Sequence, residues 1–175
     1  NTKIAALQFL AWDPLWGRCT GDVDAAVPAI LYAAMMGMDL TNNSWGGGPP
    51  SWALQDAIEY ADMLFVASAG NWSENLDINP DAGYPSAYDS ENIISVASLD
   101  VGDGMSFFSN YGFTAVDLGA PGNNIISTLP PGYYYSPDCG DADGDGYGNC
   151  GGTSMASPHV AGVAALMLSR NNNLH

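Results

Sequence analysis

Short, continuous apolar runs alternate along this chain with longer segments that have one apolar face. The short runs predict buried strands, and the longer segments predict helices with a period of about 3.6 residues. Alternating strands and helices favour an α/β fold with a mostly parallel sheet, because parallel strands need a crossover connection. The expected strands are residues 3–10, 38–44, 63–69, 93–99, 116–118 and 125–128. The expected helices are residues 24–36, 52–61 and 154–169.

Local signals refine this expectation. No linker or repeat divides the chain, so residues 1–175 are expected to form a single domain. Ser51 is the expected N-cap of the second helix, and Pro28 is expected near the first turn of the first helix. Residues 119–122 are expected to break the chain before the next strand. The residues expected to face inward from the last helix are Val160, Val163, Ala164, Met167 and Leu168.

The charge balance is strongly acidic, with 3 Lys and Arg residues, 19 Asp and Glu residues, and a formal net charge of −16. Nucleic acid and anionic membranes are excluded as partners, because too few cationic side chains are present to neutralise phosphate groups. The composition is typical of a soluble secreted protein. Cation binding or the steering of positively charged substrates is the alternative interpretation.

The chain has 3 cysteines. Cys139 and Cys150 bracket one loop and are expected to form a disulfide, whereas Cys19 is left without a partner in this count. A disulfide indicates an oxidising compartment, so we expect the protein to be extracellular.

Residues 151–162 read Gly-Gly-Thr-Ser-Met-Ala-Ser-Pro-His-Val-Ala-Gly and lie where a loop becomes the last helix. Ser154 is therefore expected in the positive field of a helix N-terminus, among small neighbours that leave space for a substrate. A serine nucleophile that attacks a carbonyl group requires these conditions. The alternative is an ordinary helix cap, since Thr-Ser pairs commonly cap helices.

Two further segments end strands with polar or glycine residues. Asn71 follows the expected central strand at residues 63–69, and ligands bind beyond the carboxyl ends of open parallel sheets. An asparagine amide at this place can donate to a developing oxyanion. Residues 42–47 end a strand in glycines and leave backbone groups to which an extended peptide can add. The alternative for both segments is a simple turn.

An acidic insertion at residues 137–152 places oxygen-bearing side chains at alternate positions. Its spacing matches the opening of an EF-hand loop, with side chains of Asp141, Asp143 and Asp145 and the carbonyl of Tyr147 as ligands. The sequence therefore predicts a Ca²⁺ site, weaker than a complete loop because Gly152 stands where the final glutamate is expected. The alternative is a solvated acidic loop closed by the disulfide.

Three motifs, in this order, resemble those of the subtilisin-like serine proteases, or subtilases. They are Ser44-Trp45-Gly46, Ala69-Gly70-Asn71 and the run from Gly152 to His159. Residues 84–86, 94–98, 108–112 and 118–122 are also similar to connecting segments of that family, so the resemblance spans nearly the whole chain. It implies a subtilisin-like three-layer fold with a mostly parallel sheet, and hydrolysis of peptide bonds.

The resemblance also implies roles for individual residues. It assigns Ser154 as the nucleophile and Asn71 as the oxyanion donor, and it implies a cis bond between Tyr84 and Pro85. It places the substrate backbone against two segments, whose residues are Ser44, Trp45, Gly46, Ala67, Ser68 and Ala69.

The chain departs from the family in one respect. Subtilases keep their catalytic Asp and His before the segment that residues 3–10 resemble, so this chain is similar to the C-terminal part of a catalytic domain, with the N-terminal part missing. Of the two histidines, His159 is expected to be structural and His175 is the last residue. We expect a polypeptide substrate, and a partner that is either the missing N-terminal half or a second copy of the chain.

The leading hypothesis is a serine endopeptidase of the subtilisin type. A second hypothesis is a weak, promiscuous ester hydrolase when the chain acts alone. A third is a non-catalytic, calcium-binding pseudoenzyme.

Overall fold

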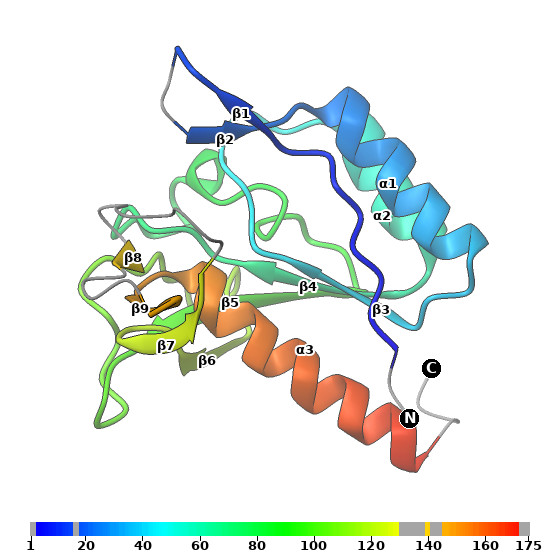
Figure 1. Ribbon diagram of the computed structural model, residues 1–175. Helices are drawn as coiled ribbons and strands as arrows, with labels where there is room; N and C mark the ends of the chain where they lie inside the picture. The colour runs from blue at the N-terminus through cyan, green and yellow to red at the C-terminus, as the bar shows by residue number, and fades with distance from the viewer. Residues whose placement is uncertain (1–2, 16–17, 130–138, 141–144, 172–175) are drawn as a thin grey trace.

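A computed structural model describes residues 3–15, 18–129, 139–140 and 145–171 (Figure 1). Within these residues, a parallel sheet of four strands forms the centre of the molecule. Its strands lie in chain order and are β3 (Leu40–Asn43), β4 (Leu64–Ser68), β5 (Ile93–Leu99) and β6 (Leu118–Pro121). Because all four run in the same direction, their carboxyl ends meet at one edge of the sheet.

Helices cover both faces of this sheet, which gives three layers (Figure 1). Helices α1 (Val23–Met35) and α2 (Trp52–Ala61) pack on one face, and α3 (Thr153–Arg170) packs on the other. The chain therefore has an α/β fold, as the alternation of strands and helices predicted. A side chain caps the start of each of the first two helices. Asp22 Oδ1 accepts from Ala25 N at 3.0 Å, and Ser51 Oγ accepts from Leu54 N at 3.4 Å.

The core is divided by the sheet into two clusters, because successive residues of a strand point to opposite faces. In β4, Phe65 and Ala67 face α1 and α2, whereas Val66 faces α3, and all three are fully buried. The buried residues of the first cluster are Ala26, Ile30, Ala33, Leu54, Ile58, Met63, Phe65, Ala67, Tyr88 and Ile93. Those of the second are Val66, Val96, Ala120, Ala156 and Ala161.

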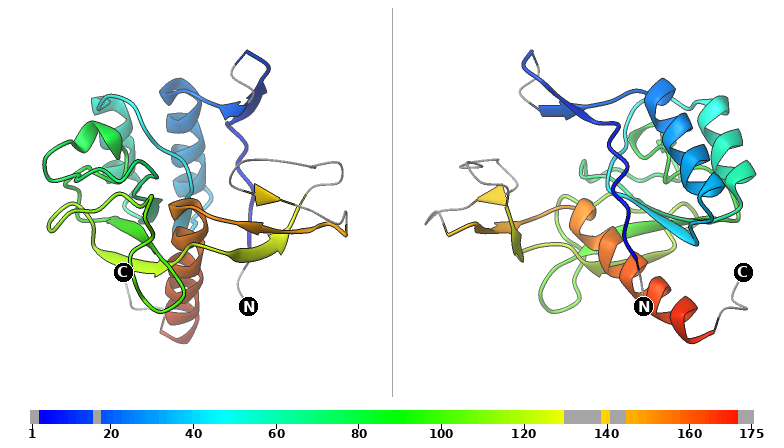
Figure 2. Two further views of the ribbon diagram at one scale, coloured as in Figure 1. Left: turned by 90° about the vertical axis from the view of Figure 1, so that its left-hand side faces the viewer. Right: turned by 45° about the vertical axis from the view of Figure 1, so that its right-hand side comes forward.

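Two small antiparallel sheets lie outside the three layers (Figure 2). One is a hairpin of β1 (Ala11–Asp13) and β2 (Arg18–Thr20). The other has β9 (Tyr147–Cys150) between β7 (Ile125–Thr128) and β8 (Cys139–Gly140). The second sheet leads directly into α3.

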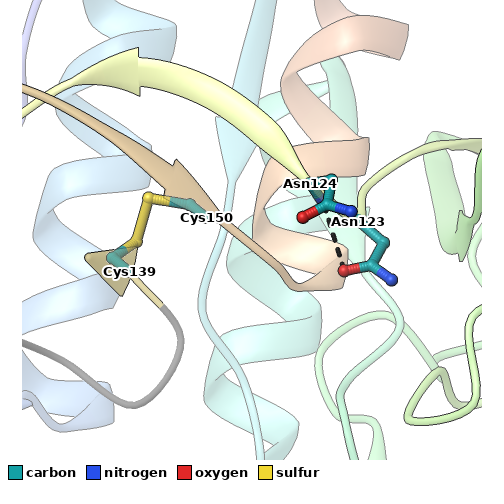
Figure 3. Close-up of a disulfide and its surroundings, with 4 residues drawn as sticks. All are labelled: Asn123, Asn124, Cys139 and Cys150. Carbon is teal, nitrogen blue, oxygen red and sulfur yellow. Dashed lines mark hydrogen bonds between the residues drawn. A yellow bond between two sulfur atoms is a disulfide. The ribbon is translucent and has the colours of Figure 1, made fainter. Parts of the chain in front are cut away.

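A disulfide between Cys139 and Cys150 joins β8 to β9 (Figure 3). Close to it, the Asn123 side chain accepts a hydrogen bond from Asn124 N at 3.0 Å and donates to Asp100 at 2.6 Å. These contacts hold the start of β7, and through β9 the approach to α3, against the central sheet.

The strand expected at residues 3–10 is absent from the described structure, so that prediction is wrong. The segment forms no ladder with β3, and its side chains are exposed or half-buried. Leu7 and Phe9 instead pack against the cluster beneath α1 and α2, and the Phe9 ring meets Trp45 edge-on at 5.0 Å. Side-chain packing, and not backbone pairing, therefore places this segment.

The strand expected at residues 116–118 is shifted, because β6 covers Leu118–Pro121, where a break was expected. Within the described residues, β6 pairs with β5 and has no strand on its other side, so it is an edge strand of the sheet. An edge strand tolerates glycine and proline. Gly119 also packs closely there, since a Cβ at this position would lie 2.8 Å from the Leu99 side chain and would displace it.

Two helix expectations are also wrong. Pro28 lies inside α1 and not in its first turn. Val163 and Met167 of α3 are exposed and do not face the core, because α3 packs on the sheet through small residues and its C-terminal half extends beyond the strands (Figure 1). In the part of the chain that the structure describes, no helix is long and apolar enough to cross a bilayer.

Candidate active site

A surface pocket of about 340 Å³ lies where the carboxyl ends of β3 and β4 meet the start of α3. Strand ends and a helix N-terminus both present backbone N–H groups that lack partners within their own element. The described residues that line it are Cys19, Ser44, Trp45, Gly46, Gly47, Ser68, Ala69, Gly70, Asn71, Trp72, Ala82, Gly83, Thr153 and Ser154. The two residues expected to carry the chemistry, Ser154 and Asn71, therefore share one pocket.

Ser154 lies in the first turn of α3 and is half-buried. Its Oγ donates to the carbonyl oxygen of Ser44 at 3.3 Å. Its backbone N–H has no acceptor within the helix, since the first four N–H groups of a helix have none. The hydroxyl and this N–H are thus both at the positive end of α3.

Pro158 explains how the end of β3 is joined to the start of α3. A proline has no N–H, so the carbonyl oxygen of Ser154 lacks the donor that a helix would supply four residues later. The Ser44 hydroxyl lies 2.8 Å from that oxygen as its donor and 3.0 Å from the Ser157 hydroxyl. These contacts fix the first turn of α3 relative to Ser44, the residue that follows β3.

The Asn71 amide is held in one orientation by Thr153. Its Oδ1 accepts from Thr153 N at 2.8 Å and from Thr153 Oγ1 at 2.9 Å. The Thr153 hydroxyl in turn accepts from Gly70 N at 3.0 Å. Because Oδ1 is occupied, the amide presents its Nδ2 group as a donor, and a Cβ on Gly152 would lie only 3.4 Å from that nitrogen.

Asn110 fixes the loop that follows Asn71. Its side chain is fully buried and donates to Ala69 O at 2.8 Å and Ala82 O at 3.1 Å. It also accepts from Trp72 N at 2.9 Å and from Glu74 N at 3.1 Å. One buried amide therefore bonds the backbone at both ends of this loop. Its burial is tolerated because its donors and its acceptor are all paired.

The expected substrate-binding residues are only partly gathered at the pocket. Ser44, Gly46, Ser68 and Ala69 line it, and so does Trp45. The Trp45 indole packs away from the pocket: its Nε1 donates to Asn43 Oδ1 at 3.2 Å, and its ring lies against Phe9 and Phe65.

Ala67 is not among the residues that line the pocket, and contact of its backbone with a substrate stays a prediction. It is one residue further back in β4, and its side chain is fully buried in the core beneath α1. Strand alternation and distance from the strand end both remove its side chain from the surface.

Sequence reasoning missed several pocket residues. Thr153 orients Asn71, Gly47 and Gly70 have positive φ angles of 99° and 103°, and Trp72 contacts both glycines. The glycines were visible in the sequence as strand-end residues. The position of the Trp72 ring depends on the loop path that Asn110 sets, and no local pattern indicates it.

His159 is exposed, and its Nδ1 lies 2.8 Å from the carbonyl oxygen of Met155, one turn earlier in α3. It does not line the pocket. In the described part of the chain, the hydroxyl of Ser154 bonds to a carbonyl oxygen and to neither an imidazole nor a carboxylate.

Two of the four expected calcium ligands, Asp141 and Asp143, lie outside the described residues. Asp145 Oδ1 accepts from Tyr147 N at 2.8 Å, which closes a turn beside the disulfide. Among the residues that the structure describes, no cluster of three or more His, Cys, Asp or Glu side chains has the geometry to hold a metal ion. The Tyr84–Pro85 bond is cis.

A three-layer α/β fold, in which a serine at the start of the last helix shares a pocket with an asparagine amide, is the combination expected from the resemblance to subtilases. The family comparison agrees: residues 14–175 match the model of the subtilase family, peptidase family S8, and the chain belongs to this family.

Individual relatives support this assignment. The chain is 37% identical over 176 residues to the thermophilic serine proteinase of Bacillus sp. (strain AK1), which covers 99% of this chain and 37% of that protein. It is 39% identical over 157 residues to thermitase of Thermoactinomyces vulgaris, covering 88% of this chain and 49% of that protein. The chain thus spans about half the length, or less, of these curated relatives.

The fold comparison leads to the same family. A crystal structure of a cold adapted subtilisin-like serine proteinase superposes with a TM-score of 0.68 at 34% identity. The match covers 89% of this chain and 51% of that one. The architecture is therefore subtilisin-like.

Proposed function

We propose that this chain supplies the nucleophile and the oxyanion-binding groups of a subtilisin-type serine endopeptidase. The observation that carries the proposal is the shared pocket of Ser154 and Asn71, in which Thr153 leaves Asn71 Nδ2 as a donor. Ser154 Oγ attacks the carbonyl carbon of a peptide bond, and Asn71 Nδ2 and Ser154 N donate to the oxygen as it becomes negatively charged. The substrate backbone lies between residues 44–46 and residues 67–69.

The proton of Ser154 Oγ needs an acceptor stronger than the carbonyl oxygen of Ser44. We propose that a histidine on a complementary polypeptide supplies it, either an N-terminal half of the domain or a second copy of this chain. Exposed apolar side chains on α3, those of Val163, Leu166 and Met167, support a docking partner on this side of the sheet.

Labelling of Ser154 tests the proposal directly. The chain is incubated with a fluorophosphonate, which bonds covalently to a serine nucleophile, and the intact mass and the modified peptide are measured. Because the chain alone lacks the proposed histidine, we expect slow formation of one adduct, on Ser154, and no adduct with Ser154→Ala. The matched control is Ser169→Ala, an exposed serine at the other end of α3, which leaves labelling unchanged. An adduct elsewhere, or equal labelling of Ser154→Ala, contradicts the proposal.

A weak ester hydrolase is the second candidate, because the Ser154 hydroxyl bonds to a carbonyl oxygen in this structure. An activated ester has a leaving group that departs without a proton, so a serine with an oxyanion site still reacts slowly. Turnover of p-nitrophenyl acetate by the chain alone, lost in Ser154→Ala, supports this activity. Unchanged turnover in the variant rejects it and favours a non-catalytic protein.

We further propose that Ca²⁺ binds the loop closed by Cys139 and Cys150, through Asp141, Asp143, Asp145 and the Tyr147 carbonyl. The alternation of oxygen ligands supports this, as does the turn that Asp145 makes with Tyr147 N. Ca²⁺ is then expected to raise the melting temperature, less so in Asp145→Ala than in the control Asp39→Ala. Equal melting temperatures in Ca²⁺ and in a chelator exclude the site.

An extracellular location completes the proposal. The Cys139–Cys150 disulfide supports it, because disulfides persist in oxidising compartments. The acidic composition, with a formal net charge of −16, is also consistent with a secreted protein.

A further inference from the structure

Trp72 occupies an unusual place in the pocket, because its indole touches the glycines of both walls. A Cβ on Gly47 would lie 3.2 Å from Trp72 Cη2, and one on Gly70 would lie 2.8 Å from Trp72 Cζ3. Gly47 follows the end of β3 and Gly70 follows the end of β4, so the ring reaches from one wall to the other. A Cβ on Gly70 would overlap the ring and one on Gly47 would press against it, so glycine at both points gives the ring its room.

The position of the ring is fixed by its backbone. Trp72 N donates to the buried Asn110 side chain at 2.9 Å, and the next residue, Ser73, donates from its N to Phe108 O at 2.9 Å. Trp72 is nevertheless 56% exposed. One side of the indole is therefore covered by the pocket, and the other faces solvent, where a bound peptide would lie.

The remaining lining of the pocket carries no charged side chain among the described residues. A substrate side chain that enters beside the indole therefore finds glycine and alanine backbone, serine hydroxyls and an aromatic ring. Such a site offers no partner for a charged substrate side chain. The indole also fills the space between Gly47 and Gly70 that a large substrate side chain would need.

We infer that Trp72 restricts this pocket to small, uncharged substrate side chains, such as those of alanine, glycine or serine, at the residue before the cleaved bond. This inference rests on the proposed function and specifies its substrate class. Removing the indole opens the slot between Gly47 and Gly70, so Trp72→Ala is expected to accept a phenylalanine side chain in its place.

Peptide binding tests the inference without requiring any reaction. Two blocked peptides, N-acetyl-Ala-Ala-Pro-Ala-amide and N-acetyl-Ala-Ala-Pro-Phe-amide, are titrated into the 175-residue chain by calorimetry. Both are uncharged, so the acidic surface does not repel either one. We expect the chain to bind the alanine peptide more tightly, and Trp72→Ala to bind the phenylalanine peptide at least about 10-fold more tightly than the unmodified chain does, the effect of filling an apolar pocket.

The matched control is Trp52→Ala, which removes a 79% exposed tryptophan at the start of α2, outside the pocket, and leaves the preference unchanged. Trp72→Phe keeps an aromatic ring and serves if Trp72→Ala does not fold. An unchanged preference in both Trp72 variants, or no binding of either peptide to any of the proteins, overturns the inference. If Ser154 is not labelled but the peptide preference still changes in the Trp72 variant, the proposed function is rejected and the inference about Trp72 stands.

Discussion

The orientation of the Asn71 amide depends on Thr153, whose backbone N–H and hydroxyl both donate to Asn71 Oδ1. This hydroxyl accepts from Gly70 N and donates to Asn71 Oδ1, so it joins the end of β4 to the start of α3. Thr153 lines the pocket, but its hydroxyl bonds Gly70 N and Asn71 Oδ1, so we treat it as a positioning residue. Loss of the hydroxyl leaves the Thr153 N–H as the remaining donor from Thr153 to Asn71 Oδ1 and removes the bond to Gly70 N, so the amide is held less firmly.

The variant Thr153→Val keeps the shape of the side chain and removes the hydroxyl. We expect fluorophosphonate labelling of Ser154 to slow on the order of 10-fold to 10²-fold, because a misplaced donor loses its alignment with the oxyanion. Thr153→Ser restores the hydroxyl and is expected to restore most of the labelling rate. Equal rates in the valine and serine variants would show that the hydroxyl does not position Asn71.

At the scale of elements, hydrogen bonds at the start of α2 join that helix to a loop beside the sheet. Ser51 caps α2 with its side chain, and both its N–H and its carbonyl oxygen bond the Tyr88 hydroxyl, at 2.8 and 3.0 Å. Burial, which outweighs this bond to Ser51, raises the pKa of the Tyr88 hydroxyl. The start of α2 is therefore tied to the loop that leads into β5.

Replacing this cap is expected to weaken the whole domain. Ser51→Ala removes the side-chain acceptor of Leu54 N, and loss of an N-cap costs about 1 kcal/mol of unfolding free energy. Urea denaturation followed by circular dichroism measures the difference. Ser169→Ala, an exposed change near the end of α3, is expected to stay within about 0.5 kcal/mol of the unmodified chain. Equal losses in the two variants would argue against a specific cap.

Asp77 joins two surface segments in a similar way. Hydrogen bonds from the Thr114 hydroxyl, and then from the backbone N–H groups of Ala115, Phe113 and Thr114, lower the pKa of its carboxyl group to about 2. A lowered pKa in the folded state adds stability above the unfolded value of 3.8, and this stability is lost as the pH falls from there towards 2.

Asp77→Asn is therefore expected to lower the melting temperature at pH 7, with the difference from the unmodified chain shrinking between about pH 4 and pH 2. Thermal melts at a series of pH values measure this. Asp39→Asn, at an exposed residue outside this turn, provides the matched control. A difference that stays constant down to pH 2 would show that the charge of Asp77 is not the cause.

At the scale of the whole molecule, one side of α3 packs on the sheet. In the described structure no element covers the other side. Its exposed apolar residues are Val163, Leu166 and Met167, with 57%, 65% and 55% of their surfaces accessible. Clustered apolar side chains of this kind on a soluble protein mark an interaction surface. The formal net charge of −16 opposes contact between copies of the chain, so salt is expected to promote it.

We expect sedimentation velocity to show association that grows with protein and salt concentration. Leu166→Lys places a charge in the centre of the apolar face and is expected to shift the chain towards the monomer without lowering its melting temperature. Ser169→Lys adds the same charge outside that face and is expected to have little effect. A monomer at all concentrations would contradict self-association through α3.

Local patterns predicted those parts of the fold whose cause is local. The strand at Ile93–Leu99 and the helix at Trp52–Ala61 agree with the sequence, because a continuous apolar run and a capped, periodic segment each have one favourable structure. Residues 3–10 did not follow their apolar pattern. Whether such a run becomes a strand depends on a neighbouring strand, which the run itself does not specify.

The sequence by itself determined the class of fold and pointed to the two residues of the candidate site, since Ser154 and Asn71 stand at element boundaries with recognisable neighbours. The tertiary structure alone decided how they act together. Thr153 reaches Asn71 from a position 82 residues away in the chain, and the Trp72 ring reaches Gly47 across the pocket. Contacts between distant segments depend on how the layers pack, and the arrangement of residues within any one segment does not encode them.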